Sequence, residues 1–267
     1  MSDQTSEGYA AVNGLDLYWE SRGSGGVPLV VVHGGYAVIS MLDGLLDSVA
    51  RNRRVVAVEL QGHGHTGDID RPFSWESFGD DLAALIGHLD LGRADLLGYS
   101  LGAGACLRAA IQHPESVRRL VVVSFPFRRD GWFPEVRASF DQMSHEGFQY
   151  MQHSPMYAAY VEVAPDPGGF PMLMDKMGEL NRRDFDWADE VKAMTAQTML
   201  VYGDADSVPT GHISDFYGLL GGGLADAGWD GSARPEARLA ILPGLTHYDI
   251  STSSQLSAVV ADFLALS

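Results

Sequence analysis

One short motif places a serine hydroxyl where it can act as a nucleophile. Gly98-Tyr99-Ser100-Leu101-Gly102 has the form G-x-S-x-G and lies between an apolar segment and a helical pattern. In such a turn the backbone is strained, so the serine side chain stands above the end of a strand, and glycines are required where neighbouring backbone crowds the turn. A hydroxyl is a weak nucleophile at neutral pH, so Ser100 requires a base.

A histidine and a carboxylate that could activate this serine follow later in the chain. His247 comes just past an apolar segment at 237–242, where Pro243 and Gly244 predict a loop. Asp204 and Asp206 follow the preceding apolar segment. We favour Asp206 as the acid because it stands just before the Val-Pro that starts the next helix and can reach across to the imidazole. Asp204 leaves the strand too early, and we interpret it as a turn residue that caps that helix.

Short apolar segments alternate with helical patterns along most of the chain, and Asn13-Gly14 predicts a tight hairpin near its start. Strands are expected at 9–12, 15–20, 28–32, 55–60, 94–98, 120–124, 198–203 and 237–242, and helices at 38–51, 75–89, 101–113, 213–220 and 255–266. Parallel neighbours need a crossover between them, so this alternation predicts an α/β fold with a mostly parallel sheet and helices on both faces.

The alternation stops between residues 126 and 196. This segment carries seven of the ten methionines and eleven of the aromatic residues (5 Trp, 10 Tyr and 11 Phe in the whole chain). We interpret it as a helical lid inserted into a single domain, 1–267, whose core is 1–125 and 197–267. Its methionines and aromatic residues either line a pocket or are ordinary core. Residues 221–235 are rich in Gly, Ala and Asp and predict a flexible surface connection.

The order Ser100, Asp206, His247, together with the elements around these residues, resembles the α/β-hydrolase superfamily over nearly the whole chain. The resemblance includes the turn His33-Gly34-Gly35-Tyr36 and the glycine-rich turn at 62–67. It implies the α/β-hydrolase fold and a serine hydrolase with these three residues as its catalytic triad.

The same resemblance implies an oxyanion hole made by the backbone N–H groups of Gly35 and Leu101. Each such donor is typically worth about 3 kcal/mol in the transition state. Candidates for lining the substrate pocket are Tyr36, Tyr99, Trp132 and Phe133.

The composition excludes several other classes of function. A formal net charge of −17 disfavours nucleic acid and anionic membranes as partners. Cys106 is the only cysteine, so no intrachain disulfide can form, and its place on a helix predicts a small buried thiol. The first residues have no signal-peptide pattern and no segment is long and apolar enough to span a bilayer, so a cytoplasmic protein is expected.

The remaining histidines do not predict a metal site. His63 and His65 lie in a glycine turn without further placed ligands, which falls short of a zinc site. His33 is expected to be a structural hydrogen-bonding group rather than a base. No metal and no cofactor are expected, and the sequence does not indicate an oligomeric state.

The expected activity is hydrolysis of a small to medium, largely apolar carboxylic ester through an acyl-enzyme. Lactones, thioesters, amides, carbon–carbon bonds and peracid formation remain open alternatives. A different class of function is a small-molecule receptor that keeps the triad, since one fold can carry many functions. Turnover separates the two, because a receptor would show a single or very slow turnover.

Overall fold

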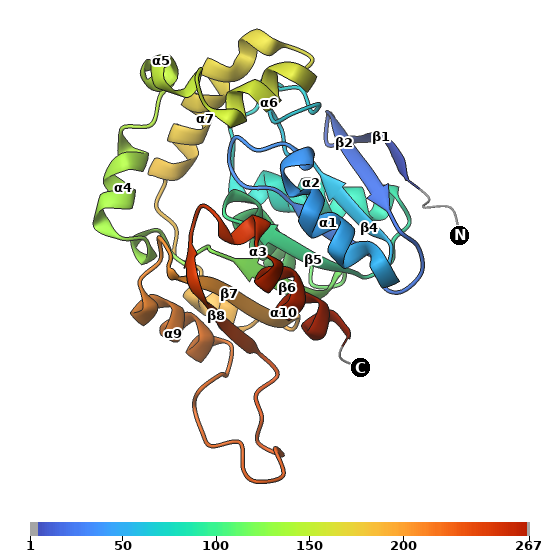
Figure 1. Cartoon of the computed structure of the whole chain (residues 1–267), viewed down its shortest axis with the longest axis vertical. Helices are drawn as coiled ribbons and strands as arrows, with labels where there is room; N and C mark the ends of the chain where they lie inside the picture. The colour runs from blue at the N-terminus through green and yellow to red at the C-terminus, as the bar shows by residue number, and fades with distance from the viewer. Residues whose placement is uncertain (1–4, 266–267) are drawn as a thin grey trace.

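The strands form one eight-stranded sheet in the computed structural model, which describes residues 5–265 (Figure 1). They are β1 Ser6–Val12, β2 Leu15–Arg22, β3 Leu29–Val32, β4 Val55–Val58, β5 Ala94–Tyr99, β6 Val117–Val123, β7 Gln197–Ala205 and β8 Arg238–Thr246. Their order across the sheet is β1-β2-β4-β3-β5-β6-β7-β8. Strand β2 is antiparallel to both β1 and β4, and the pairs from β4 to β8 are parallel. The mostly parallel α/β fold is therefore confirmed.

The central strands of the sheet are buried on both faces, and successive side chains of each strand point to opposite faces. In β6, Leu120 and Val122 belong to one hydrophobic core, whereas Val121 and Val123 belong to the other. All four side chains are fully buried. This explains why the strands are continuous apolar segments in the sequence rather than alternating ones.

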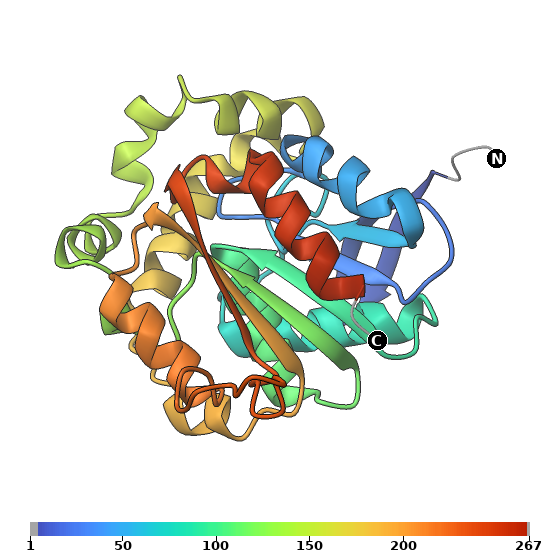
Figure 2. The same ribbon diagram turned by 60° about the horizontal axis from the view of Figure 1, so that its bottom comes forward.

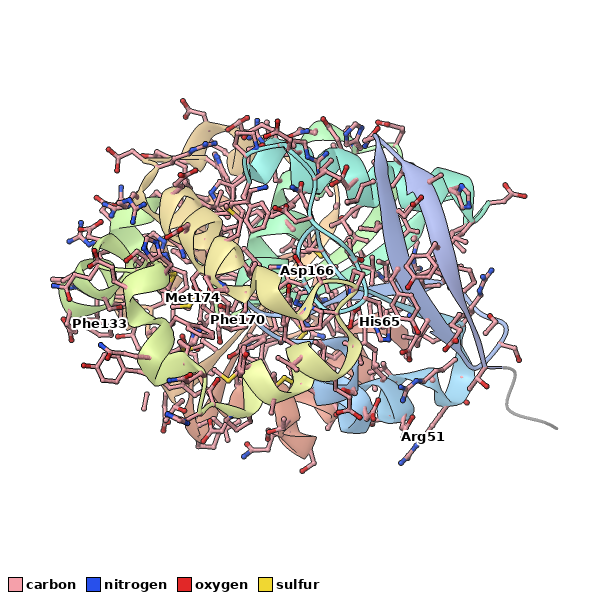
Figure 3. The ribbon with its side chains drawn as sticks, turned by 90° about the horizontal axis from the view of Figure 1, so that it is seen from above. Arg51, His65, Phe133, Asp166, Phe170 and Met174 are labelled. Atoms are coloured by element: carbon pink, nitrogen blue, oxygen red, sulfur yellow. The ribbon has the colours of Figure 1, made fainter. Side chains whose placement is uncertain are left out.

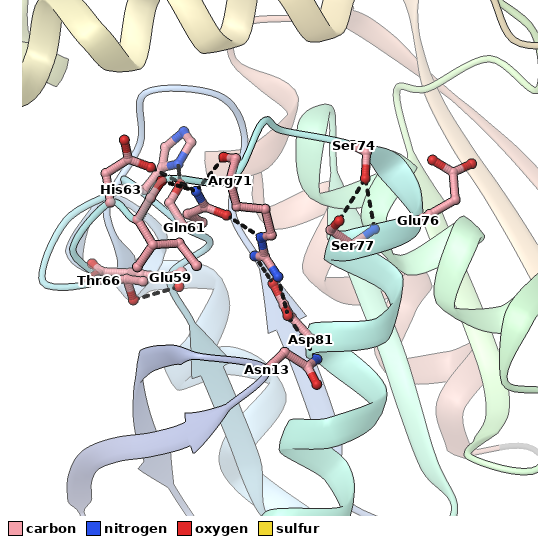
Figure 4. A network of polar contacts seen from close by, with 12 residues as sticks. Asn13, Glu59, Gln61, His63, Thr66, Arg71, Ser74, Glu76, Ser77 and Asp81 are labelled. Carbon is pink, nitrogen blue, oxygen red and sulfur yellow. Dashed lines mark hydrogen bonds and ion pairs between the residues drawn. The ribbon is translucent and has the colours of Figure 1, made fainter.

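The helices cover these two faces. They are α1 Asp43–Val49, α2 Trp75–His88, α3 Leu101–Gln112, α4 Pro134–Asp141, α5 Phe148–Met151, α6 Pro155–Val163, α7 Phe170–Arg182, α8 Ala188–Lys192, α9 Thr210–Leu219 and α10 Ser254–Ala265. Helices α1 and α10 lie on one face (Figure 2), while α2, α3 and α9 contribute to the core on the other. Helix α2 begins after Ser74, whose hydroxyl accepts a hydrogen bond from the N–H of Ser77 (Figure 4).

Helix α3 packs closely against aromatic side chains because it carries small residues. A Cβ atom at Gly104 would lie 2.5 Å from the ring of Trp75 and 2.6 Å from the ring of Phe125. Cys106 in the same helix is fully buried, as predicted, and burial raises the pKa of its thiol.

Two predictions near the start of the chain have different outcomes. The hairpin turn is confirmed, because Asn13 and Gly14 both have positive φ, 51° and 80°. The helix expected at 38–51 is shorter, with α1 flanked by 3₁₀ turns at Ile39–Leu42 and Ala50–Asn52. Its first residue, Asp43, places a carboxylate at the positive end of the helix.

Strand β8 is longer than predicted, and the expected loop at Pro243 and Gly244 is part of it. Proline is tolerated because β8 is an edge strand that pairs only with β7, so the missing N–H removes no hydrogen bond from a second neighbour. The pairing shifts register between Gly203 and Ala205, which accommodates the extra residues of β8.

Five of the helices, α4 to α8, lie between β6 and β7 in the sequence, and we call residues 126–196 the insertion. Helices α4 to α7 lie at the top and left of the molecule in Figure 1. Figure 3 looks down on them and labels Phe133, Phe170 and Met174. Phe170 and Met174 are buried in the same core as α2 and α3. The segment between α9 and β8 is a long loop at the bottom of Figure 1, with Leu224 and Trp229 exposed.

Polar contacts anchor the loop that follows β4. Arg71 forms a bidentate pair with Asp81 of α2, at 3.1 and 2.6 Å, and the Asn13 amide donates to the same carboxylate (Figure 4). Lys176 of α7 also joins this loop, because its Nζ donates to the Ile69 carbonyl at 2.8 Å and to the Arg71 carbonyl at 3.1 Å. Lys176 also pairs with the Asp68 carboxylate at 2.6 Å, so a half-buried cation ties the insertion to the core. Within residues 5–265, no helix combines the length and hydrophobicity needed to cross a membrane.

Candidate active site

The serine motif forms a sharp turn from β5 into α3. Ser100 has φ 52° and ψ −116°, a conformation that L-residues rarely adopt and that costs of order 1–3 kcal/mol. A Cβ atom at Gly98 would lie 2.2 Å from the Gly102 carbonyl oxygen, and one at Gly102 would lie 2.4 Å from that of Val32. The two glycines are thus required by close backbone approach, the reason given for them from the sequence.

His247 lies beside this serine. The distance from Ser100 Oγ to His247 Nε2 is 3.1 Å, and that from His247 Nδ1 to Asp206 Oδ1 is 3.2 Å. The His247 and Asp206 side chains are 12% and 0% exposed. One ring nitrogen can therefore take the serine proton while the other faces a carboxylate, which is the geometry a nucleophile–base–acid relay needs.

The Asp206 carboxylate is surrounded by donors. Oδ2 accepts from Ser124 Oγ at 2.5 Å and from Gly203 N at 3.2 Å, and Oδ1 accepts from Ser207 N at 2.7 Å. Burial alone would raise the pKa of Asp206, but the hydrogen bond and charge of His247, followed by the bonds from Ser124 and Gly203, lower it overall. The carboxylate is therefore held ionised and in a fixed orientation.

Asp204 does not lie in the turn before the next helix, where the sequence predicts it. It lies within β7, and its Oδ1 accepts from the N–H of Gly244 in β8 at 2.9 Å. Helix α9 begins after Pro209 without a side-chain cap. The prediction that Asp204 caps this helix is wrong, because β7 extends further than expected and turns this side chain toward the register shift with β8.

Tyr99 lies between the serine turn and the His247 loop. Its hydroxyl donates to the His247 carbonyl oxygen at 2.6 Å, and the rings of these residues are 5.6 Å apart. A Cβ atom at Gly34 would lie 2.7 Å from the Tyr99 ring. Tyr99, a candidate for lining the pocket, is thus placed where it holds the backbone of His247.

The turn after β3 is held by His33. Its Nε2 accepts from the N–H of Leu60 at 3.1 Å, so Nδ1 carries the proton and donates to the Gly34 carbonyl at 2.6 Å. That carbonyl belongs to the same peptide plane as the Gly35 N–H, so His33 fixes the direction of this donor. Burial lowers the pKa of His33, which stays neutral and structural, as expected. Leu101 is the first residue of α3, where backbone N–H groups have no partner within the helix.

Apolar side chains of the insertion surround these groups. Trp132 is buried, with its ring 5.6 Å from that of His247. Phe133 is 37% exposed, and its N–H donates to the Ser207 carbonyl at 3.2 Å. The Met177 methyl group of α7 lies 2.9 Å from the position of a Cβ atom at Gly35, and the Tyr36 ring is 5.6 Å from that of Phe170. Of the four pocket candidates, Tyr99 and Trp132 therefore lie beside His247, whereas Tyr36 follows Gly35 and contacts Phe170 of the insertion.

The two histidines of the glycine-rich turn at 62–67 are packed against other groups of the protein. His63 is fully buried, and burial, with a smaller contribution from His33, lowers its pKa to about 3. His65 Nδ1 lies 3.0 Å from the buried Glu59 carboxylate. Among residues 5–265, no group of three or more His, Cys, Asp and Glu side chains is arranged to hold a metal ion.

Several residues of the site were missed from the sequence. Ser124 was expected only to end a strand, and its signal was a polar residue at the end of an apolar segment. Met177 of α7, whose methyl group lies against Gly35, carries no motif that could have identified it.

Comparison with known proteins adds the family context. The sequence model of the family described as alpha/beta hydrolase fold matches residues 27–210. The 2-hydroxymuconate semialdehyde hydrolase of Pseudomonas sp. (strain CF600) is 36% identical over 110 residues, 38% of this chain and 39% of that protein. The pimeloyl-[acyl-carrier protein] methyl ester esterase of Pectobacterium carotovorum is 31% identical over 143 residues, 50% of this chain and 52% of that protein.

The likeness extends to solved structures. The enol-lactonase from Burkholderia xenovorans LB400 has a TM-score of 0.71 and 21% identity, over 97% of this chain and 100% of that chain. This likeness concerns the fold. The first curated relatives are matched over only 31% to 41% of their own lengths.

Proposed function

Because the chain belongs to the alpha/beta hydrolase fold family, we propose that it is a serine hydrolase with Ser100 as nucleophile, His247 as base and Asp206 as the orienting acid. The observation that carries the proposal is the continuous contact from Ser100 Oγ through both ring nitrogens of His247 to Asp206, at 3.1 and 3.2 Å. Curated relatives named as hydrolases support the same reaction class.

The proposed reaction begins when Ser100 attacks a carbonyl carbon and passes its proton to His247 Nε2. The tetrahedral oxyanion is stabilised by the N–H groups of Gly35 and Leu101, and by the positive end of α3. His247 then protonates the leaving group, and an acyl-enzyme remains on Ser100. Water activated by His247 releases the acid, and Asp206 stabilises the imidazolium in both steps.

The proposed substrate is a small to medium, largely apolar carboxylic ester. The apolar groups next to the reacting atoms support this choice, namely the ring of Trp132 beside His247 and the methyl group of Met177 beside Gly35. We propose further that the chain is one hydrolase domain and that the insertion acts as its lid. The contact of Met177 of α7 with the turn at 34–37, which carries the Gly35 N–H and which we call the oxyanion turn, supports that role.

The relatives leave a second bond type open. One is named a methyl ester esterase and is matched over 52% of its length, and the other is named a semialdehyde hydrolase and is matched over 39%. We therefore propose the ester as the first substrate class to test and keep lactones, thioesters, amides and carbon–carbon bonds as alternatives.

The test uses p-nitrophenyl esters from acetate to laurate with the purified protein, Ser100→Ala, Asp206→Asn and the matched control Asp204→Asn. We expect Ser100→Ala to lose at least about 10⁴-fold in kcat and Asp206→Asn to lose about 10³- to 10⁴-fold. Asp204→Asn should retain most activity, because an amide oxygen can still accept from Gly244.

The outcomes separate the alternatives. Turnover that survives in Ser100→Ala would refute the triad. A stoichiometric burst without turnover would instead favour a receptor or a different acyl group. Equal losses in Asp204→Asn and Asp206→Asn would refute the choice of acid.

A further inference from the structure

The turn that carries the Gly35 N–H contains a residue in an unfavourable conformation. The Gly34 carbonyl accepts from the N–H of Ala37 at 3.2 Å, which closes a four-residue turn. Tyr36, the third residue of this turn, has φ 62°. Glycine or asparagine normally occupies such a position, because a side chain with a Cβ atom is strained there. Tyrosine at this point calls for an explanation beyond the turn itself.

The Tyr36 hydroxyl adds a second unfavourable feature. Its oxygen is buried and has no hydrogen-bond partner within residues 5–265. Most buried polar side-chain atoms in proteins are hydrogen-bonded, so an unpaired one is uncommon. Phenylalanine would fill the same space without leaving a donor unpaired. The hydroxyl is therefore unexplained by packing.

The position of the side chain relates this hydroxyl to the candidate active site. Tyr36 directly follows Gly35, and its ring is 5.6 Å from that of Phe170 at the start of α7. Met177 of the same helix lies against Gly35. The Tyr36 ring therefore occupies the layer between the oxyanion turn and the insertion.

The charges around the hydroxyl indicate what it can bind. Burial raises the pKa of Tyr36, and the negative charge of Asp175 raises it further, so the phenol is protonated and can donate. The Asp175 carboxylate accepts from His145 N at 2.8 Å and lies 2.9 Å from His145 Nδ1, and its negative charge disfavours an anion beside the Tyr36 hydroxyl. A neutral oxygen acceptor fits this environment better than a carboxylate.

We propose that the Tyr36 hydroxyl is a specificity-determining group that donates a hydrogen bond to a neutral ether, keto or hydroxyl oxygen of the substrate. This oxygen lies a few bonds from the scissile carbonyl, within hydrogen-bond reach of the Tyr36 hydroxyl. The inference rests on the proposed hydrolase function and narrows its substrate class from apolar esters to esters that carry one additional neutral acceptor.

The test compares pairs of esters that differ only by replacement of one CH₂ group with an ether oxygen. The replacement is moved along the acyl chain of p-nitrophenyl esters, and then along the alcohol of acetate esters. The ratio of kcat/KM within each pair is measured for the wild type, Tyr36→Phe and Tyr150→Phe. Dividing the wild-type ratio by that of the variant cancels the intrinsic reactivity of each ester. Tyr150 is a matched control because it lies in the insertion and is 76% exposed.

We expect one position of the oxygen at which the wild type favours the ether about tenfold more than Tyr36→Phe does. This corresponds to about 1.4 kcal/mol, one net hydrogen bond. Tyr150→Phe should keep the wild-type ratio. The melting temperature of Tyr36→Phe should be equal to or higher than that of the wild type, since an unpaired buried hydroxyl is removed.

Three results would overturn the inference. Ratios that are the same in wild type and Tyr36→Phe at every position would leave the hydrolase in place and remove only the role of Tyr36. An equal loss on both members of every pair, with a lower melting temperature, would show a structural role. If the wild type hydrolyses neither member of any pair, the proposed ester substrate class fails, and the inference fails with it.

Discussion

Replacement of Ser124 by alanine tests how the acid of the candidate triad is held. Ser124 Oγ donates to Asp206 Oδ2 at 2.5 Å, a short hydrogen bond of the charge-assisted kind. Hydrogen bonds to charged groups contribute about 1.5–3 kcal/mol each. We therefore expect Ser124→Ala to lower the free energy of unfolding by about 2 kcal/mol at neutral pH.

The same change should affect catalysis. With Ser124 absent, Oδ2 keeps only the longer bond from Gly203 N at 3.2 Å. The carboxylate can then rotate away from His247, and we expect kcat to fall about tenfold, the equivalent of about 1.4 kcal/mol. KM should change little, because Ser124 is fully buried behind Asp206.

The pH dependence separates this mechanism from a simple packing defect. The lowered pKa of Asp206 gives stability that is present above the ordinary carboxyl pKa and is lost as the pH falls through the folded-state value. Removing a donor to the ionised carboxylate brings the pKa of Asp206 in the folded protein closer to its pKa in the unfolded chain. The difference in unfolding free energy between wild type and Ser124→Ala should therefore be full at neutral pH and shrink in acid.

The assay combines urea unfolding from pH 3 to 7 with ester hydrolysis at neutral pH. Ser139→Ala is the matched control, because that exposed hydroxyl donates only to the Val136 carbonyl of its own helix. If the difference in unfolding free energy between wild type and Ser124→Ala stays constant from pH 7 down to pH 3, the electrostatic reasoning is refuted. Unchanged kcat in a folded Ser124→Ala protein would refute the positioning role.

Four further perturbations follow from the geometry. Tyr99→Phe removes the bond to the His247 carbonyl and should lower kcat about three- to tenfold by ester assay, with little effect on the melting temperature. Lys176→Met leaves the Asp68 carboxylate and two loop carbonyls without their cation, so we expect a several-fold higher KM and faster limited proteolysis of α7. His212 is buried with its pKa lowered to about 4, so the unfolded chain binds one more proton between that value and the ordinary histidine value of about 6.5. For this residue, the free energy of unfolding should fall by about 1.4 kcal/mol for each unit by which the pH is lowered within that window. His212→Gln should flatten this slope, which is measured by urea unfolding. Gly102→Ala would place a Cβ atom 2.4 Å from the Val32 carbonyl oxygen and should lower the unfolding free energy by about 3 kcal/mol or prevent folding.

The sequence predicts those features that depend on local chemistry. The G-x-S-x-G turn needs glycine on both sides of Ser100 because backbone atoms approach within the same short segment. Continuous apolar segments predict strands buried on both faces, and the alternation with helical patterns predicts the parallel sheet. The dipeptide Asn13-Gly14 predicts the hairpin because both of its residues tolerate positive φ.

Features that depend on distant contacts are not predictable in this way. Ser124 and Asp206 are 82 residues apart, and Tyr99 and His247 are 148 apart. Nothing local to either member of these pairs specifies its partner. The end of β8 was misjudged for a related reason, since Pro243 ends a strand only where both neighbours are present, and β8 lies at the sheet edge.

Because the chain has a single cysteine, the rate of its chemical modification can measure how often the core beneath Ser100 opens. Cys106 lies in α3, the helix that begins directly after Ser100, is fully buried, and is the only cysteine in the sequence. Disulfide reagents react with the thiolate, and burial raises the pKa of this group. Modification therefore requires a transient opening of α3, and at high reagent concentration its rate equals the opening rate. Comparing that rate with and without an acylated Ser100 would show how strongly the covalent intermediate closes the protein around itself.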